Sequence, residues 1–396
     1  MMSDRFITDD IDVVDIANTF AEELKARSGE FEEQGFVSQD LVDRLAELGM
    51  YRLCNPKTYG GLGRSPLEYA TLVERLAEFD AATGWVVFIG ITSALSMTNL
   101  EMDVVSKMMA DSLAITAGVF APLGRASRCE ANGVKGFRLT GQWQWGSGSK
   151  NAAFISGGGF VVDDSGERLK LENGLPDQRS FFMPIEDVEI LDTWHVSGLK
   201  GTGSADFKVD GVFVPESMTF GAFRKNTGHG PIQRFPVFGF LGIGIGAVAL
   251  GIARACLDEF LSLAKQKTPQ GSSKSLAMKP ATHVRVAEAE AKLRSARLFF
   301  HDAISTAWDL AQENNKVTVE AKRDIRLATT HAVRTSAEVV DSIYTLAGGT
   351  SVYLRSPIQQ HFRDVHVATQ HMMVNESTLE LVGRLFVGID TNVALL

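Results

Sequence analysis

The sequence predicts an α+β fold with an N-terminal α-helical domain, a middle β-barrel-like domain and a C-terminal four-helix bundle. Two observations predict it. Hydrophobic residues recur at helical spacing up to about residue 114 and again from about residue 235, and short apolar runs broken by Gly, Asn and Asp lie between them. We therefore expect domains at residues 1–114, 115–222 and 223–396. A chain of 396 residues with 45% hydrophobic content can bury a large core.

The N-terminal domain contains helices with marked ends. In "SPLEYATLVERLAEFD", Ser65 is expected to cap the helix, Pro66 suits the first turn, and Glu68 completes a capping box. In "SQDLVDRLAELGM", three leucines share one face and Gly49 is expected to end the helix.

The middle domain contains four stretches that predict strands. These are "FRLTGQWQWGSG", "AAFISGGGFVV", "RSFFMPIEDVEIL" and "ADFKVDGVFVPE". In the last, Asp210 and Gly211 form a dipeptide that is typical of a hairpin turn.

The C-terminal region contains two long, Ala-rich amphipathic segments, residues 273–315 and 318–349, which predict bundle helices. The apolar run at residues 235–255 is about long enough to span a bilayer, so a transmembrane helix has to be considered. No second such segment follows. We interpret the run as a buried helix whose glycines let a flat group or another backbone approach closely.

Charge and cysteine content exclude several classes of function. A net charge of -9 disfavours nucleic acid and membrane surfaces as partners. The three cysteines, Cys54, Cys129 and Cys256, are far apart, which argues against a disulfide framework or a cysteine zinc site. The start, "MMSDRFITDDIDVV", is acidic and lacks an apolar signal core, so we expect a cytoplasmic protein.

Four segments in this order resemble the acyl-CoA dehydrogenase superfamily over nearly the whole chain. They are "YGGLGRSPLEYATLVERLAEFDAATGW", "LTGQWQWGSGSKNAAFISGG", "WHVSGLKGTGSADFKVDGVFVPE" and "LAGGTSVYLRSPIQQHFRDVHVATQH". The resemblance implies an acyl-CoA dehydrogenase-like fold that binds a flavin, with these segments around the flavin and the active site.

The carboxylate base of a dehydrogenase is missing from this resemblance. Aligning Arg363 and Asp364 with the family's Arg-Asp pattern places Met372 at the base position, and a thioether cannot accept a proton at neutral pH. Some relatives supply the base from an earlier helix, near Leu241 here, but no Asp or Glu occurs at residues 217–257. Both usual sources of the base are therefore absent.

This absence resembles the oxygenase components of two-component flavin-dependent monooxygenases, such as the hydroxyphenylacetate and steroid phenol hydroxylases and dibenzothiophene monooxygenase. The resemblance implies reduced FAD or FMN and O2 as cofactors, a flavin hydroperoxide, and a small aromatic or heterocyclic substrate. It also implies an NAD(P)H-dependent flavin reductase as partner and a homotetramer. The alternatives are an acyl-CoA dehydrogenase-type flavoenzyme with an unidentified base, and a binding subunit that has lost catalysis.

The resemblance assigns two catalytic residues, His371 in "ATQH" and Ser147 in "WGSGS". An imidazole could hydrogen-bond the peroxide or the flavin, and a serine hydroxyl could contact the flavin ring. A core histidine and a simple turn are the alternatives. The further cofactor-binding candidates are Trp145, Trp194, Lys200, Gly201, Thr202, Arg234, Gly348, Gly349, Thr350, Gln359 and Arg363.

Trp85, Ser93 and Met372 are the candidates for the substrate pocket. Ser93 occupies a position where the phenol hydroxylases tend to have a histidine, so a sulfur, amine or less acidic carbon substrate is more plausible than a phenol. A metal site is not expected. His361, His366 and His371 are five residues apart, so on a helix they cannot share one ligand face.

Overall fold

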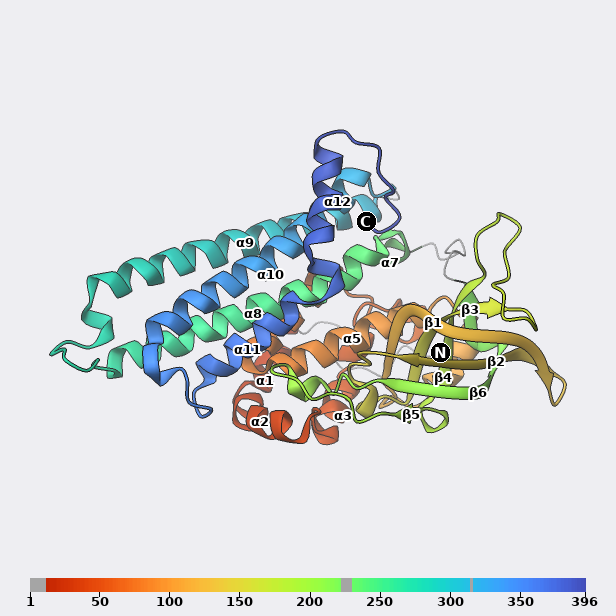
Figure 1. Ribbon diagram of the computed structural model, residues 1–396, viewed down its shortest axis with the longest axis horizontal. Helices are drawn as coiled ribbons and strands as arrows, with labels where there is room; N and C mark the ends of the chain where they lie inside the picture. The colour runs from red at the N-terminus through yellow and green to blue at the C-terminus, as the bar shows by residue number, and fades with distance from the viewer. Residues whose placement is uncertain (1–11, 222–229, 314–315) are drawn as a thin grey trace.

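The structure is a computed structural model that describes residues 12–221, 230–313 and 316–396. Long helices extend to one side of the molecule and the sheet lies at the opposite side (Figure 1). The predicted boundary between residues 222 and 223 lies outside the described residues, and the division into three domains remains a prediction. The α, β, α order of the elements agrees with the expected fold class.

Two helix ends that the sequence predicts in the N-terminal domain are present, a helix start at Ser65 and a helix end before Gly49. They are α1 (Val13–Thr19), α2 (Ala21–Gln34), α3 (Gln39–Glu47), α4 (Pro66–Phe79), α5 (Ala81–Met97) and α6 (Met102–Met108). The capping box of α4 is present: the Glu68 backbone N–H donates to Ser65 Oγ over 3.2 Å, and the Ser65 backbone N–H donates to the Glu68 carboxylate over 2.8 Å. Helix α3 ends before Gly49, whose φ of 76° is left-handed.

The middle domain is a mixed seven-stranded sheet with the order β5-β6-β2-β1-β3-β4-β7. Its strands are β1 (Thr116–Ala131), β2 (Val134–Trp143), β3 (Phe154–Val162), β4 (Gln178–Pro184), β5 (Glu189–Ile190), β6 (Phe207–Pro215) and β7 (Thr219–Gly221). Strands β1 and β3 pair in parallel and the other neighbours are antiparallel.

The predicted hairpin at Asp210 and Gly211 is wrong, because both residues lie inside β6. The pairing of β2 with β6 shifts between Leu139 and Gly141, opposite this dipeptide, and Gly211 has a φ of 66°. A bulge and a tight turn both use a left-handed glycine, so the same dipeptide suits either structure.

The C-terminal helices are α7 (Pro231–Arg234), α8 (Val237–Gln266), α9 (Pro280–Gln312), α10 (Val319–Ala347), α11 (Pro357–Thr369) and α12 (Glu376–Phe386). Helices α8 to α11 run side by side in Figure 1. Helix α8 is long and apolar enough to cross a membrane, but 89% of its most apolar window is buried in the fold. A Cβ on Gly244 would lie 2.3 Å from the Phe88 ring, and one on Gly251 would lie 2.4 Å from the Glu74 carbonyl. These glycines let α4 and α5 approach α8, so the interpretation as a buried helix is confirmed.

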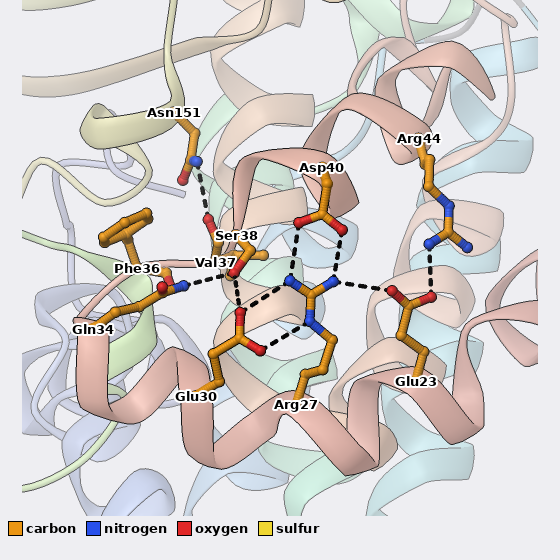
Figure 2. Close-up of polar contacts among 10 residues, drawn as sticks. All are labelled: Glu23, Arg27, Glu30, Gln34, Phe36, Val37, Ser38, Asp40, Arg44 and Asn151. Carbon is orange, nitrogen blue, oxygen red and sulfur yellow. Dashed lines mark hydrogen bonds and ion pairs between the residues drawn. The ribbon is translucent and has the colours of Figure 1, made fainter.

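A polar network joins helices α2 and α3 to the β-domain (Figure 2). Arg27 bonds three carboxylates, those of Glu23, Glu30 and Asp40. Asn151, in the short 3₁₀ helix η3 (Ser149–Asn151), donates to the Val37 carbonyl over 3.0 Å. The turn between the two helices therefore supports the loop that carries Ser147.

Candidate functional site

Trp85, in helix α5, brings together the two predicted catalytic residues, Ser147 from the middle domain and His371 from the C-terminal helical region. Its indole Nε1–H donates to Ser147 Oγ over 3.1 Å. Its ring centroid lies 6.1 Å from that of His371 and 4.9 Å from that of Phe88. Trp85, Ser147 and His371 thus lie together in one wall of side chains.

A chain of buried hydroxyls extends from Ser147 into the β-domain. Ser147 Oγ lies 2.5 Å from Ser204 Oγ, which lies 2.7 Å from Thr202 Oγ1. The Thr202 hydroxyl donates to the Leu199 carbonyl over 2.8 Å. Sequence reasoning selected Thr202 but missed Ser204, the residue that follows the second glycine of "KGTGS".

The turn that carries this chain is held by a carboxylate from helix α11. Leu199 has a left-handed φ of 50°, and its backbone N–H donates to Asp364 Oδ1 over 2.6 Å. The Trp194 indole donates to the Leu199 carbonyl over 3.3 Å. Burial raises the pKa of Asp364 to about 7, and the Leu199 N–H and the Arg363 charge oppose that rise. In the sequence, Asp364 served only to align the Arg-Asp pattern of the family, and no role in the site was predicted for it.

His371 lies just beyond the end of α11, at the start of the 3₁₀ helix η9 (Met372–Val374). The Met373 backbone N–H donates to His371 Nδ1 over 3.2 Å, so the proton of the neutral ring is on Nε2. Burial, with a smaller effect from the Arg326 charge, lowers the pKa of His371 to about 4. At neutral pH His371 is therefore an uncharged N–H donor.

Arg326, in helix α10, is buried against the loop that carries His371. Its side chain is 4% exposed, Nη2 donates to Thr378 Oγ1 over 3.2 Å, and Nη1 lies 3.9 Å from Met373 Sδ. Within the described part of the chain, Arg326 Nε has no hydrogen-bond partner. Burial lowers the pKa of Arg326 to about 10. Arg326 was not predicted from the sequence, because the sequence of an Ala-rich helix does not distinguish a buried arginine from a solvent-exposed one.

Two predicted cofactor residues meet at one carboxylate instead of lying free. Lys200 Nζ lies 3.5 Å from the Glu32 carboxylate, and Arg363 Nη1 bonds both Glu32 and the Ser197 carbonyl. Arg363 Nε also donates to Gln359 Oε1 over 2.7 Å. These residues connect α2, α11 and the 3₁₀ turn η5 (Lys200–Thr202) in the single chain, and their contact with a cofactor remains a prediction.

Most of the other predicted residues lie apart from the Trp85 wall, although the Trp145 carbonyl accepts from the Ser147 backbone N–H over 2.9 Å. Arg234 Nε donates to the Ala311 carbonyl over 2.7 Å, which attaches α7 to α9. Gly348, Gly349 and Thr350 form the 3₁₀ turn η8 that follows α10. Trp145 and Met372 are 67% and 64% exposed. Ser93 is buried in α5. Their roles remain predictions. Among the described residues, no group of three His, Cys, Asp or Glu is arranged to hold a metal ion.

Comparison with known proteins gives the family. The family model for the N-terminal domain of acyl-CoA dehydrogenase matches residues 12–102, and the model for its C-terminal domain matches residues 243–376. XiaF from Streptomyces sp., solved in complex with FADH2 and glycerol, superposes with a TM-score of 0.88 at 23% identity. That match covers 96% of this chain and 95% of XiaF.

Two curated relatives are oxygenases. Indole-3-acetate monooxygenase from Pseudomonas putida is 34% identical over 92% of this chain and 90% of its own length. The oxygenase subunit HsaA of a flavin-dependent monooxygenase from Rhodococcus jostii is 27% identical over 88% of this chain and 91% of its own. The chain therefore belongs to the acyl-CoA dehydrogenase family, as an oxygenase component of the flavin-dependent monooxygenases.

Proposed function

We propose that this chain uses reduced FAD or FMN and O2 to oxygenate a ring carbon of a small arylacetic acid of the indole-3-acetate kind. The observation that carries the proposal is the wall of Trp85, Ser147 and His371. It offers a hydroxyl and a neutral imidazole, while apolar side chains, Met372 and Leu241, occupy the two positions at which the family places its base.

The residues of this wall suit a flavin ring. Ser147 Oγ accepts from Trp85 and shares a hydrogen with Ser204, so one lone pair remains for a donor on the ring. His371 Nε2–H can donate to an oxygen or nitrogen beside it. A reduced flavin, when bound, supplies the two electrons that activate O2. Ser147 and His371 would hold it from the β-domain and from the C-terminal helices.

The protonation state of the wall favours oxygenation over dehydrogenation. Removal of an α-proton from a thioester needs a base at the reacting carbon. His371 has a lowered pKa, but its Nδ1 is already occupied by the Met373 N–H and its Nε2 carries a proton. Neither atom is free to take a proton, so the residue can hold a hydrogen bond without abstracting one.

The substrate class follows from Ser93 and from the indole-3-acetate relative. A serine in place of a histidine leaves no imidazole at this position to deprotonate a phenol. An indole ring carbon is electron-rich without deprotonation, so it does not need that base. Trp85 and Phe88 supply aromatic surface in the same helix, α5. The relative at 34% identity has indole-3-acetate in its name.

The test is product analysis under labelled oxygen. The purified chain, a flavin reductase, NADH and FAD or FMN are incubated with indole-3-acetate under ¹⁸O2, and the products are analysed by mass spectrometry. We expect one ¹⁸O atom per product molecule, and none when the reductase is omitted. Bleaching of bound oxidised flavin by an acyl-CoA, without labelled product from indole-3-acetate, would support the dehydrogenase alternative instead.

The proposal includes a separate flavin reductase as partner, a homotetramer and a cytoplasmic location. The relatives named as oxygenase subunits support the first. Large apolar side chains that are more than half exposed, Val352, Tyr353 and Leu354, follow the η8 turn and support association through this end of the bundle. The free thiols of Cys54 and Cys256 are buried, which suits a reducing compartment. Light scattering after size exclusion, at four times the 43.0 kDa chain mass, tests the tetramer.

A further inference from the structure

The hydroxyl chain that starts at Ser147 has only one direction that keeps all of its hydrogen bonds. At one end the Trp85 indole nitrogen can only donate, and at the other end the Leu199 carbonyl can only accept. Three hydroxyls lie between these ends, each with one hydrogen. Thr202 gives its hydrogen to Leu199, so Ser204 must give its hydrogen to Thr202, and Ser147 must give its hydrogen to Ser204.

This direction leaves Ser147 with one kind of free capacity. Its oxygen accepts one bond from Trp85 and its hydrogen is used by Ser204, so only a lone pair remains. Ser147, Ser204 and Thr202 are 5%, 3% and 1% exposed, so water does not easily replace a lost partner. Reversal of the chain would break the bond to Leu199 inside a buried turn.

We propose that Ser204 and Thr202 make Ser147 an obligate hydrogen-bond acceptor, so that the site selects reduced over oxidised flavin. The inference rests on the proposed function, which sets the flavin ring against Ser147. The central ring of a reduced flavin carries an N–H at N5, whereas N5 of an oxidised flavin is a bare acceptor. A Ser147 hydroxyl that can only accept would bond the N5–H of reduced flavin. With oxidised flavin, its lone pair would face the lone pair of N5 and repel it.

Ser204 and Thr202 are therefore positioning residues that act through Ser147. The Leu199 carbonyl sets the direction of the chain, and it is fixed in turn by the left-handed backbone of Leu199 and the bond from its N–H to Asp364. A protein in which Ser204 cannot accept the Ser147 hydrogen should let that hydrogen turn toward the flavin. Ser147 could then also donate to oxidised flavin.

The experiment measures dissociation constants of reduced and oxidised FAD and FMN, under anaerobic conditions, for the full chain and its variants. We expect Ser204→Ala to lower the preference for reduced flavin about tenfold, mainly by tighter binding of the oxidised form. Thr202→Val should lower it less, because Ser204 can still accept the Ser147 hydrogen, although its own hydrogen is then also free to turn toward Ser147. Tenfold corresponds to a shift of about 30 mV in the two-electron potential of the bound flavin, which gives a second readout.

Two comparisons separate direction from simple structural damage. Ser149→Ala removes a fully buried hydroxyl, two residues from Ser147, that has no hydrogen-bond partner among the residues the structure describes, and it should leave the preference unchanged. In a Ser147→Ala background, Ser204→Ala should add no further change, because the effect passes through Ser147.

Each outcome decides something. A preference that is the same in wild type, Ser204→Ala and Thr202→Val, with reduced flavin still bound, overturns the inference and leaves the proposed function intact. Wild-type protein that binds neither reduced FAD nor reduced FMN overturns both. A loss of preference in Ser149→Ala as large as in Ser204→Ala would show that packing, and not hydrogen-bond direction, is responsible.

Discussion

The candidate site has two parts that differ in their hydrogen bonding. The saturated wall is the hydrogen-bonded chain from Trp85 through Ser147, Ser204 and Thr202 to Leu199, and the helical wall is Arg326 with the loop that carries His371. On the β-domain side, every hydrogen between Trp85 and Leu199 has a partner, and the chain is closed at both ends. On the helical side, the guanidinium of Arg326 is buried beside the His371 loop, its Nε has no hydrogen-bond partner among the described residues, and the described partners of its side chain are a hydroxyl and a thioether. All hydrogen-bond donors of the saturated wall have partners, whereas the helical wall contains the positive charge of Arg326 without a described carboxylate partner.

This difference teaches how each wall controls a bound group. A saturated chain acts through direction, since the loss of Ser204 or Thr202 changes which atom of Ser147 is free. An unpaired buried charge acts over distance, since the low-dielectric interior transmits it to its neighbours. Together with burial, which is the larger cause, the Arg326 charge lowers the pKa of His371. Substitutions in the first wall should change selectivity, and those in the second should change protonation.

The largest expected effect comes from removing the donor of the helical wall. His371→Ala should lower the ratio of oxygenated product to hydrogen peroxide roughly 100-fold, the usual cost of one preorganised donor at a reacting oxygen. His371→Gln, which keeps an N–H, should lose less. The measurement is product and peroxide per reduced flavin consumed. His366→Ala is the matched control, because His366 lies in α11 shortly before His371 and its ring bonds Asp341 of α10. A His371→Ala protein with wild-type ratios would remove His371 from the chemistry.

The next largest effect concerns the hydrogen bond from the Leu199 N–H to Asp364, which attaches the turn at the end of the hydroxyl chain to helix α11. Burial raises the pKa of Asp364 from 3.8 to about 7, so the stability that this residue contributes is present below pH 3.8 and is lost as pH rises through 7. Asp364→Asn keeps an acceptor for Leu199 and removes that loss. Relative to wild type, the variant should gain roughly 2 to 3 kcal/mol between pH 5 and pH 8.

Thermal unfolding at pH 5, 6, 7 and 8 measures this gain as a difference in Tm. His361 and His371, whose pKa values are lowered, make both proteins more stable as pH rises from about 4 to 6.5, so only the difference between variant and wild type is informative. Parallel Tm curves for Asp364→Asn and wild type would mean that Asp364 is ionised throughout.

A smaller effect should follow from neutralising the unpaired charge. In Arg326→Met the pKa of His371 should rise toward its ordinary value of 6.5, because one cause of its depression is gone. At pH 5 the variant should then give a few-fold less product than at pH 7.5, while wild type changes little. The NMR titration of the ring signals measures the shift. His361 is the internal reference, because burial alone lowers its pKa to about 4. Equal titration of His371 in both proteins would contradict the role of Arg326.

Local features of the fold were predictable from the sequence, and the partners within the site were not. The capping box of Ser65 and Glu68 spans three residues, so neighbours in the sequence decide it. Resemblance selected Ser147 and His371 by their motifs. Ser204 is 57 residues from Ser147, and Asp364 is 165 residues from Leu199. Pairs at such distances are chosen by packing of the whole chain, which hydrophobic periodicity does not encode.

The smallest expected effect identifies which end sets the direction of the saturated wall. Trp85→Phe keeps a ring against Phe88 but removes the N–H given to Ser147, so Tm should fall by about 1 °C for the loss of about 1 kcal/mol. The preference for reduced flavin should stay within about twofold of wild type. The Leu199 carbonyl still takes the Thr202 hydrogen, so Ser147 still gives its own to Ser204. If this variant instead lost the preference as Ser204→Ala is expected to, the indole end would be the one that orients the chain, and the closed turn at Leu199 would serve packing alone.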